Sequence, residues 1–221
     1  MACRLAHTIR SSLTSIDGGL AELGASPSVA SDPTLLRYAT LGRQSVRELV
    51  DLAERFEWAG RAERVAAEPT EVLQWPDVIR RCVEARCVER QRRNRKQIDV
   101  SIAEAVGEGR AHRLACERAL AELLDNAVRH ARTAVQVTAD VDGEYLRVRI
   151  GDDGLGLPNG GVGSFAPPQE IKSRLGFGLW LVERLAAALQ GSVGVERTGE
   201  DGTEMCLRIP VFGRLDSKPA G

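Results

Sequence analysis

The chain has 221 residues, 43% of them hydrophobic and 28% charged, with a formal net charge of −1 and a pI of about 6.3. This balance is typical of a folded protein, and the lack of a basic field disfavours nucleic acid or membrane surfaces as partners. The sequence has no apolar run long enough to span a bilayer and no signal peptide, so we expect a cytoplasmic protein. Its five cysteines match no zinc or disulfide framework, which favours reduced core cysteines.

The N-terminal part predicts two helices joined by a turn. Apolar residues recur at spacings of three and four over residues 3–23, at Leu5, Ile9, Leu13, Ile16 and Leu20. Residues 24–33 are dense in Gly, Ser and Pro and predict a turn, and a second helix is expected over 34–68. A lone helical hairpin buries little apolar surface. The pattern therefore favours a four-helix bundle in a homodimer, with packing on the chain's own second domain as the alternative.

The remainder of the chain mixes helices with largely antiparallel strands. Helices are expected over residues 77–96, 112–131 and 179–189, and strands over 97–102, 135–141, 145–151, 192–197 and 204–211. The dipeptide Asp142-Gly143 between two strands predicts a hairpin. This order indicates an α+β fold. We expect a helical domain over 1–68, a second domain over 69–212 and a flexible tail over 213–221.

Polar side chains gather on one face of the helix expected over 112–131. Helical spacing places on roughly this face the side chains of Glu122, Asn126, Arg129 and His130. Polar groups on an otherwise apolar helix need a partner, and a metal-bound polyphosphate provides one. An Asn oxygen is a hard ligand suited to Mg²⁺, and an Arg neutralises phosphate oxygens.

Two glycine-rich motifs follow this helix in the sequence. Residues 151–158 (GDDGLGLP) come directly after a strand, where glycines let the backbone approach a flat ligand and Asp152 can accept a hydrogen bond from an adenine amino group. Residues 176–182 (GFGLWLV) place a glycine pair before an apolar helix, whose N-terminus attracts phosphate. Either motif alone is weak evidence, but the three motifs in this order and spacing predict a nucleotide site.

The segment from about 115 to 211 resembles the catalytic domain of two-component sensor histidine kinases, within the GHKL superfamily that includes gyrase, Hsp90 and MutL. The three motifs resemble that family's N, G1 and G2 boxes, and Gly202-Thr203 resembles its final glycine–threonine element. The resemblance implies a Bergerat-type α/β sandwich that binds ATP and Mg²⁺ beneath a flexible lid, here about 159–175. This lid is short, only Phe165 could stand in for its aromatic box, and Arg174 replaces a frequent glycine.

The resemblance also implies roles for individual residues. Asn126 would ligate Mg²⁺, Glu122 would assist the metal or its water, and Arg129 would contact phosphate. Asp152 would hold the adenine amino group. The residues that would shape the pocket and the lid hinges are Gly154, Gly156, Gly176 and Gly178. The remaining candidates for contact with the nucleotide are His130, Leu179 and Thr203.

Residues 7–13 (HTIRSSL) resemble the H box of these kinases, and the likeness extends through the whole hairpin, their dimerisation and phosphotransfer domain. A neutral His7 nitrogen could attack the γ-phosphate of ATP. Thr8 replaces the usual acid and offers no charge to an imidazolium, and Ser12 replaces the usual Pro, so we expect a slow or specialised autokinase. Ser11 stands where relatives orient water for phosphatase action. Only six residues precede His7, which indicates a piece of a longer kinase or an input from another protein.

The leading hypothesis is therefore a histidine kinase core that phosphorylates His7 and passes the phosphoryl group to an aspartate of a response regulator receiver domain. One alternative is a serine kinase of the anti-sigma-factor type, which uses the same ATP fold but lacks such a hairpin. Another is a pseudokinase or phosphotransfer scaffold, which Thr8 and Ser12 favour and the intact Asn126 and Asp152 oppose.

Overall fold

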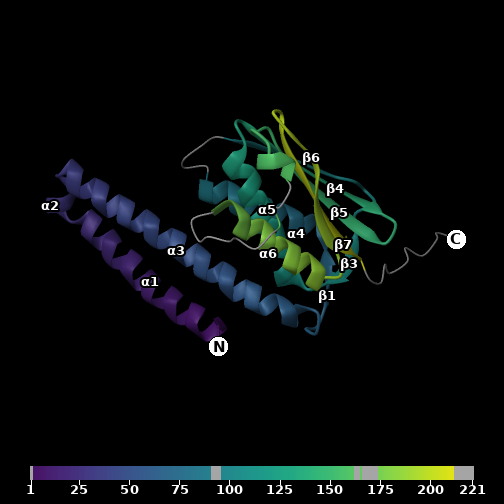
Figure 1. Ribbon diagram of the computed structural model, residues 1–221, viewed down its shortest axis with the longest axis horizontal. Coiled ribbons are helices and arrows are strands. Elements are labelled where there is room, and N and C mark those ends of the chain that lie inside the picture. Colours follow the sequence, from purple (N-terminus) through teal and green to yellow (C-terminus); the bar gives the residue numbers. More distant parts are fainter. Residues whose placement is uncertain (1, 91–95, 162–164, 166–173, 212–221) are drawn as a thin grey trace. The chain divides into compact units, whose positions relative to one another are not determined.

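The computed structural model describes residues 2–90, 96–161, 165 and 174–211 (Figure 1). The chain divides into two compact units, Met1–Arg61 and Ala62–Gly221. Helix α3 (Pro33–Val65) begins in the first unit, and its last four residues belong to the second. Among the helices that the structure describes, none is long and apolar enough to cross a membrane.

The first unit is the expected helical hairpin. Helix α1 (Ala2–Ala25) and helix α3 are joined through a short helix α2 (Pro27–Ala30), which lies inside the stretch predicted as a turn. Asp32 caps α3, because its Oδ1 accepts hydrogen bonds from the backbone N–H groups of Thr34 (2.8 Å) and Leu35 (3.2 Å). The two long helices are bridged by Arg43, whose Nε lies 3.1 Å from Asp17 Oδ1.

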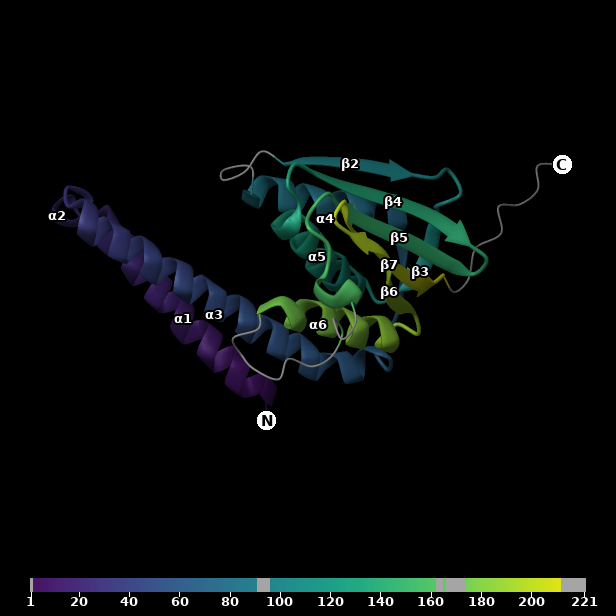
Figure 2. The ribbon, with the colours of Figure 1, turned by 45° about the horizontal axis from the view of Figure 1, so that its top comes forward.

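The second unit is built on a five-stranded sheet with three helices on one of its faces (Figures 1 and 2). The strand order is β2 (Gln97–Ile102), β4 (Ala134–Asp142), β5 (Tyr145–Asp152), β7 (Gly202–Pro210) and β6 (Ser192–Gly199). Strands β2 and β4 are parallel, and the other pairs are antiparallel. The helices are α4 (Trp75–Arg90), α5 (Arg113–His130) and α6 (Arg174–Ala188). The α+β prediction is confirmed.

A separate two-stranded sheet pairs β1 (Glu71–Gln74) with β3 (Glu108–Ala111). Strand β1 lies within residues 68–76, a stretch with two prolines that the sequence predicts as a linker or entry strand. Strand β3 was not expected, because its sequence EGRA lacks the apolar alternation by which strands are recognised. Its pairing with β1 is a tertiary contact that a local pattern does not report.

The core of the second unit lies between the sheet and the helices. Alternate residues of β5 and β7 point to the helices and are fully buried, as in Leu146, Val148, Ile150, Leu207 and Ile209. The helices contribute Leu120, Leu123, Leu124, Leu181 and Leu185, all at most 1% exposed. The leucine-rich side of α5 therefore faces the core.

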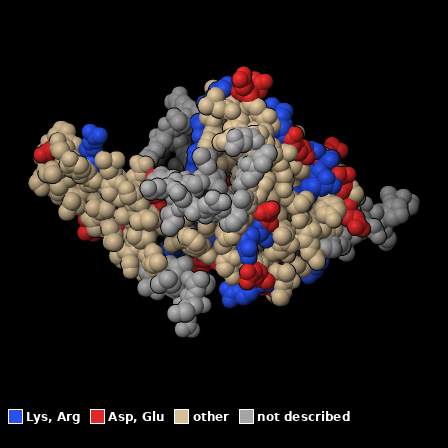
Figure 3. Space-filling view, viewed as in Figure 1, with Lys and Arg blue, Asp and Glu red and all other residues tan. Residues whose placement is uncertain are grey.

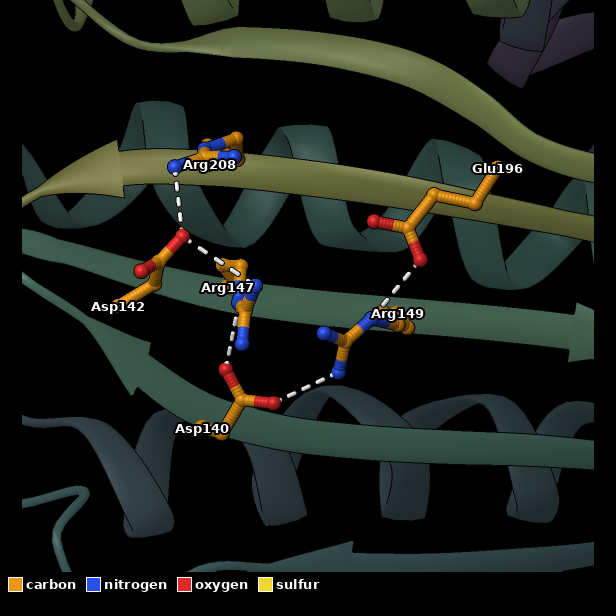
Figure 4. A network of polar contacts seen from close by, with 6 residues as sticks. All are labelled: Asp140, Asp142, Arg147, Arg149, Glu196 and Arg208. Atoms are coloured by element: carbon orange, nitrogen blue, oxygen red, sulfur yellow. Dashed lines mark hydrogen bonds and ion pairs between the residues drawn. The ribbon is translucent and has the colours of Figure 1, made fainter.

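The other face of the sheet carries a network of ion pairs (Figure 4). Asp140 on β4 accepts from Arg147 Nε and from Arg149 Nη1 on β5, each at 2.7 Å. Arg149 Nε also lies 2.8 Å from Glu196 Oε2 on β6, and Asp142 pairs with Arg147 and with Arg208 on β7. The two arginines hold the pKa of Asp140 below its ordinary range, mainly through the hydrogen bond from Arg147. Charges therefore cover this face in matched pairs across four strands.

The start of helix α6 differs from the prediction. The helix begins at Arg174, five residues before the expected start at Leu179, so Gly176 and Gly178 lie inside its first turns and do not precede it. Glycine is a poor helix former, so the local pattern predicts a helix that begins only after these two glycines. Packing of Phe177, Leu179 and Leu181, each at most 6% exposed, outweighs that cost.

Candidate nucleotide-binding site

Helix α5 presents the candidate metal-binding residues at different depths. Glu122 is 4% exposed, and its carboxylate is paired with the guanidinium of Arg118 one turn earlier. A buried carboxylate needs such a partner, because desolvation penalises its charged form. Asn126 is half-buried one turn further on, and Arg129 and His130 are exposed at the end of the helix. The predicted polar face therefore runs from the core to the surface.

Helix α6 meets this polar face at Gly178. A Cβ on Gly178 would lie only 2.9 Å from Glu122 Oε2, so a side chain here would displace the carboxylate. Gly178 and Glu122, predicted on separate motifs, are thus neighbours. Leu179 is 2% exposed and packs in the core, so it supports the site from behind and does not line its surface. Gly176 lies two residues nearer the start of α6 than Gly178.

The end of strand β5 brings Asp152 against the end of α5. Asp152 is 7% exposed, and its Oδ1 accepts a hydrogen bond of 2.9 Å from Gly154 N. Burial raises the pKa of Asp152, although the backbone N–H groups of Gly154 and Thr203 partly offset this effect. A Cβ on Gly154 would lie 2.5 Å from the carbonyl oxygen of His130. The glycine therefore permits the close approach that joins the first and second motifs.

His130 is electrostatically linked to the same cluster. Desolvation lowers the pKa of His130, with a further contribution from Arg129, whereas Asp152 opposes the shift. At neutral pH the imidazole is consequently held in its uncharged form, which can accept a hydrogen bond.

The loop that follows β5 is fastened to the β6–β7 hairpin. Gly156 has φ +78°, and a Cβ there would clash with the backbone of Gly199. Thr198 Oγ1 accepts a hydrogen bond of 2.7 Å from Leu157 N and lies 3.4 Å from Thr203 Oγ1. Thr203 is 3% exposed and pairs in register with Asp152. The predicted glycine–threonine element thus lies beside the second motif.

Sequence reasoning missed two residues that hold this site together. Asp153 Oδ1 accepts from the backbone N–H groups of Arg132 (2.7 Å) and Thr133 (3.0 Å), which fixes the turn between α5 and β4. These bonds hold the pKa of Asp153 well below its ordinary value, the side-chain hydroxyl of Thr133 contributing most. Lys96 Nζ donates to Val128 O at 2.8 Å and also to Ala131 O, so it caps the C-terminal end of α5.

The remaining predicted residues lie elsewhere or outside the described part. His7 and Ser11 belong to helix α1 of the first unit, where Ser11 is exposed and its carbonyl accepts from Ser15 Oγ at 3.2 Å. Only the backbone of His7 is described, as part of that helix. The greater part of the expected lid, residues 162–164 and 166–173, lies outside the described residues. Within the described residues, no group of three or more His, Cys, Asp or Glu side chains could hold a metal ion.

Residues 111–212 match the model of the "Histidine kinase-, DNA gyrase B-, and HSP90-like ATPase" family. The chain contains a GHKL-type ATPase domain of the sensor histidine kinase kind. This match places α5, the β5 loop and α6 inside one family domain and confirms the resemblance found in the sequence.

Curated relatives of this GHKL domain are sensor kinases. The sensor histidine kinase PdtaS of Mycobacterium tuberculosis is 34% identical over 102 residues, which cover 43% of this chain and 19% of that protein. The sensor histidine kinase RcsC of Escherichia coli is 27% identical over 106 residues, which cover 44% of this chain and 11% of that protein. The aligned parts thus span a fifth or less of these relatives.

Solved structures share the fold of the GHKL domain and of the residues before it. Full-length ShkA in complex with AMPPNP has a TM-score of 0.75 at 22% identity, covering 95% of this chain and 45% of that one. The histidine kinase AdeS of Acinetobacter baumannii has a TM-score of 0.61 at 16% identity, covering 91% of this chain and 96% of that one. At these identities the likeness establishes the fold.

Proposed function

We propose that this chain is the kinase core of a two-component system, which binds ATP with Mg²⁺, phosphorylates His7 and passes the phosphoryl group to a response regulator aspartate. The observation that carries the proposal is the convergence of the three motifs. Glu122 meets Gly178, and His130 meets Gly154 beside Asp152, although these residues are far apart in the sequence. The α6 motif and the end of β5 therefore both lie against helix α5, about two turns apart.

Asp152 would recognise the adenine base of the nucleotide. Its carboxylate is buried at the strand end and keeps acceptor capacity for an adenine amino group beyond the bonds to Gly154 and Thr203. Gly154 and Gly156 would shape the loop beside the base through their close backbone contacts, and Thr203 would support the carboxylate from β7. Because burial raises the pKa of Asp152, base recognition weakens on acidification at a higher pH than an ordinary aspartate would cause.

The phosphates would lie over the polar face of α5 and the start of α6. Asn126 and Glu122 would hold Mg²⁺ together with phosphate oxygens, and the ion would neutralise charge on the transferred group. Mg²⁺ is usually bound through one or two side chains plus substrate phosphates, which is what Asn126 and Glu122 with a bound nucleotide would provide. Arg129 and His130 are exposed at the same helix end and would contact phosphate, and Gly176 and Gly178 would give it access to α6.

The transfer step requires a neutral imidazole on His7. Its nitrogen forms a bond to the γ-phosphorus while the bond to the bridging oxygen of ADP breaks. Thr8 leaves the resulting imidazolium without a neighbouring carboxylate, so we propose a slow autokinase. Ser11 would position water for phosphatase action on the response regulator. ATP and response regulators are cytoplasmic, and the proposal places this chain there.

The partner of the hairpin would be a second copy of the same hairpin. Among the side chains described in the first unit, nine large apolar ones are exposed by 40% or more, namely Ile9, Ile16, Leu23, Leu35, Leu36, Tyr38, Leu41, Leu49 and Phe56. The part of the hairpin visible in Figure 3 is correspondingly poor in charge. Pairing two such hairpins into a four-helix bundle would cover these residues and bring the homodimer together.

The proposal is tested by incubating the full chain with γ-labelled ATP and Mg²⁺. We compare the parent chain with His7→Gln and Asn126→Ala, and with Gln44→Ala and Gln136→Ala as matched controls at exposed amide residues. Acid-labile, base-stable label that both test variants lose and both controls keep would support a histidine kinase. Label that survives His7→Gln would instead favour a serine kinase, and nucleotide binding without label would favour a scaffold, as Thr8 suggests.

A further inference from the structure

His112 is a buried polar residue that the proposed chemistry does not use. It lies directly before helix α5 and is 7% exposed. Its Nδ1 accepts a hydrogen bond of 3.2 Å from the backbone N–H of Ala115, so the imidazole is the N-cap of the helix. Its Nε2 lies 2.6 Å from Glu68 Oε2.

These two contacts define the tautomer of the imidazole ring. An imidazole nitrogen that accepts from an amide N–H carries no hydrogen, so the hydrogen must be on Nε2. Nε2 then donates to the part-buried Glu68 carboxylate, and a hydrogen bond to a charged acceptor is among the stronger kinds. His112 therefore caps α5 through Nδ1 and donates a hydrogen bond to the Glu68 carboxylate through Nε2.

Glu68 lies in the short connection between the end of α3 at Val65 and the start of β1 at Glu71. A second contact comes from the last turn of α3, where Glu63 Oε1 lies 2.9 Å from Nη2 of Arg184 on α6. That second pair is weaker, because the Glu63 side chain is 76% exposed and screened by water. The part-buried His112–Glu68 pair therefore joins this connection to the start of α5, next to the more exposed ion pair of Arg113 with Glu71 at 3.1 Å.

We propose that His112 is a positioning residue for the nucleotide site, because it fastens the first turn of α5 to the chain that leaves α3. This inference rests on the proposed function. Lys96 holds the opposite end of α5 through Val128 O and Ala131 O. A helix fixed at both ends cannot slide or rotate, and it carries Glu122 and Asn126 in a constant relation to Gly178 and Asp152.

The two contacts of His112 can be separated by substitution in the full chain. His112→Asn keeps a strong N-cap, but its side chain is too short to reach Glu68. Glu68→Ala removes the same His112–Glu68 hydrogen bond and leaves the cap. His112→Ala removes both contacts. Glu63→Gln is the matched control, because it removes an exposed charge from the last turn of α3, five residues before Glu68.

Two measurements are made on each variant: affinity for Mg²⁺-bound fluorescent ATP, and hydrogen exchange of the Ala115 amide without nucleotide. We expect His112→Asn and Glu68→Ala to weaken nucleotide binding about fivefold each, and the double variant to be no weaker than either, because both remove one interaction. The Ala115 amide should exchange at least tenfold faster in His112→Ala, and His112→Asn should restore most of its protection. Glu63→Gln should stay within twofold of the parent chain.

Parent-like nucleotide affinity in both His112→Asn and Glu68→Ala would overturn the inference and reduce His112 to a helix cap. Additive losses in the double variant would also overturn it, because they would mean that the two residues act separately. If the parent chain binds no nucleotide, the proposed function fails. Hydrogen exchange of the amides in the first turns of α5 then tests by itself whether the His112–Glu68 contact holds the start of this helix. Faster exchange there in Glu68→Ala would still support the fastening, and unchanged exchange would overturn it.

Discussion

The hairpin and the ATPase unit expose opposite kinds of surface. In the hairpin, large apolar side chains such as Leu41, Leu49 and Phe56 face solvent, and the buried apolar side chains described are the small Ala39, Val46, Ala53 and Ala59. In the ATPase unit, large apolar residues fill a closed core between sheet and helices. Its free sheet face is covered by paired charges instead (Figure 4).

This difference indicates which unit is complete by itself. A buried core with a charged exterior stabilises a monomeric domain, whereas a contiguous apolar surface marks an interaction site. The ATPase unit should therefore owe its stability to internal packing, and the hairpin should owe much of its stability to association. The following changes test that contrast, from the largest expected effect to the smallest.

Leu207→Ala should destabilise the ATPase unit by about 3 kcal/mol, because truncating a fully buried Leu loses transfer free energy and leaves a cavity. The exposed Leu49→Ala on the hairpin is the control, and it should cost less than about 0.5 kcal/mol in a monomer. Urea unfolding of dilute protein measures both. Equal losses would show that the hairpin also has a closed core.

Gly202→Ala should cost about 2–3 kcal/mol, because its φ of +116° is strained for any side chain and a Cβ would collide with the backbone of Asp152. Gly194→Ala, where a Cβ meets nothing within 4 Å, is the matched control on the neighbouring strand. Thermal unfolding distinguishes them. A small effect at Gly202 would mean that the β5–β7 contact can shift, and Asp152 with it.

Leu41→Lys should weaken self-association about tenfold or more, equivalent to about 1.4 kcal/mol, because a charge would enter the apolar surface between two hairpins. Gln44→Lys on the same helix is the control at an exposed polar residue. Sedimentation at several concentrations gives the dimer constant. An unchanged constant would place the partner of the apolar surface elsewhere.

Acidification should weaken the ATPase unit through Asp153. Because its folded pKa is depressed, its contribution is present above about pH 4 and is lost as the pH falls below that value toward the folded pKa. Asp153→Asn should therefore be less stable at pH 7 and should lose less stability between pH 5 and pH 3. Urea unfolding at these pH values tests this, with the exposed Asp201→Asn as control. Parallel pH profiles for parent and Asp153→Asn would contradict it.

Arg149→Met should have the smallest effect, about 1 kcal/mol or less, since its ion pairs lie on a partly solvated face and are screened by salt. The loss should shrink in 1 M salt, which urea unfolding at two ionic strengths measures. A salt-independent loss would mean that the aliphatic stem of Arg149 matters more than its charge.

Much of this molecule could be anticipated from local patterns. Amphipathic spacing predicted the helices of the hairpin and α5, and alternation with the Asp142-Gly143 turn predicted the β4–β5 hairpin, which the strand register confirms. The start of α6 was misplaced because Gly176 and Gly178 disfavour a helix locally, and β3 was missed because it lacks alternation. Both errors arise where tertiary packing outweighs local preference.

The sequence by itself determined the types of chemistry available: an Asn and a Glu one turn apart, an Asp at a strand end, and glycines where a ligand needs space. Only the tertiary structure decided that Glu122 adjoins Gly178, that Arg118 neutralises it, and that His112 and Lys96 hold α5 at its two ends. The reason is physical. Spacing along a chain specifies which face of a helix a side chain occupies, whereas its partner across space depends on how whole elements pack.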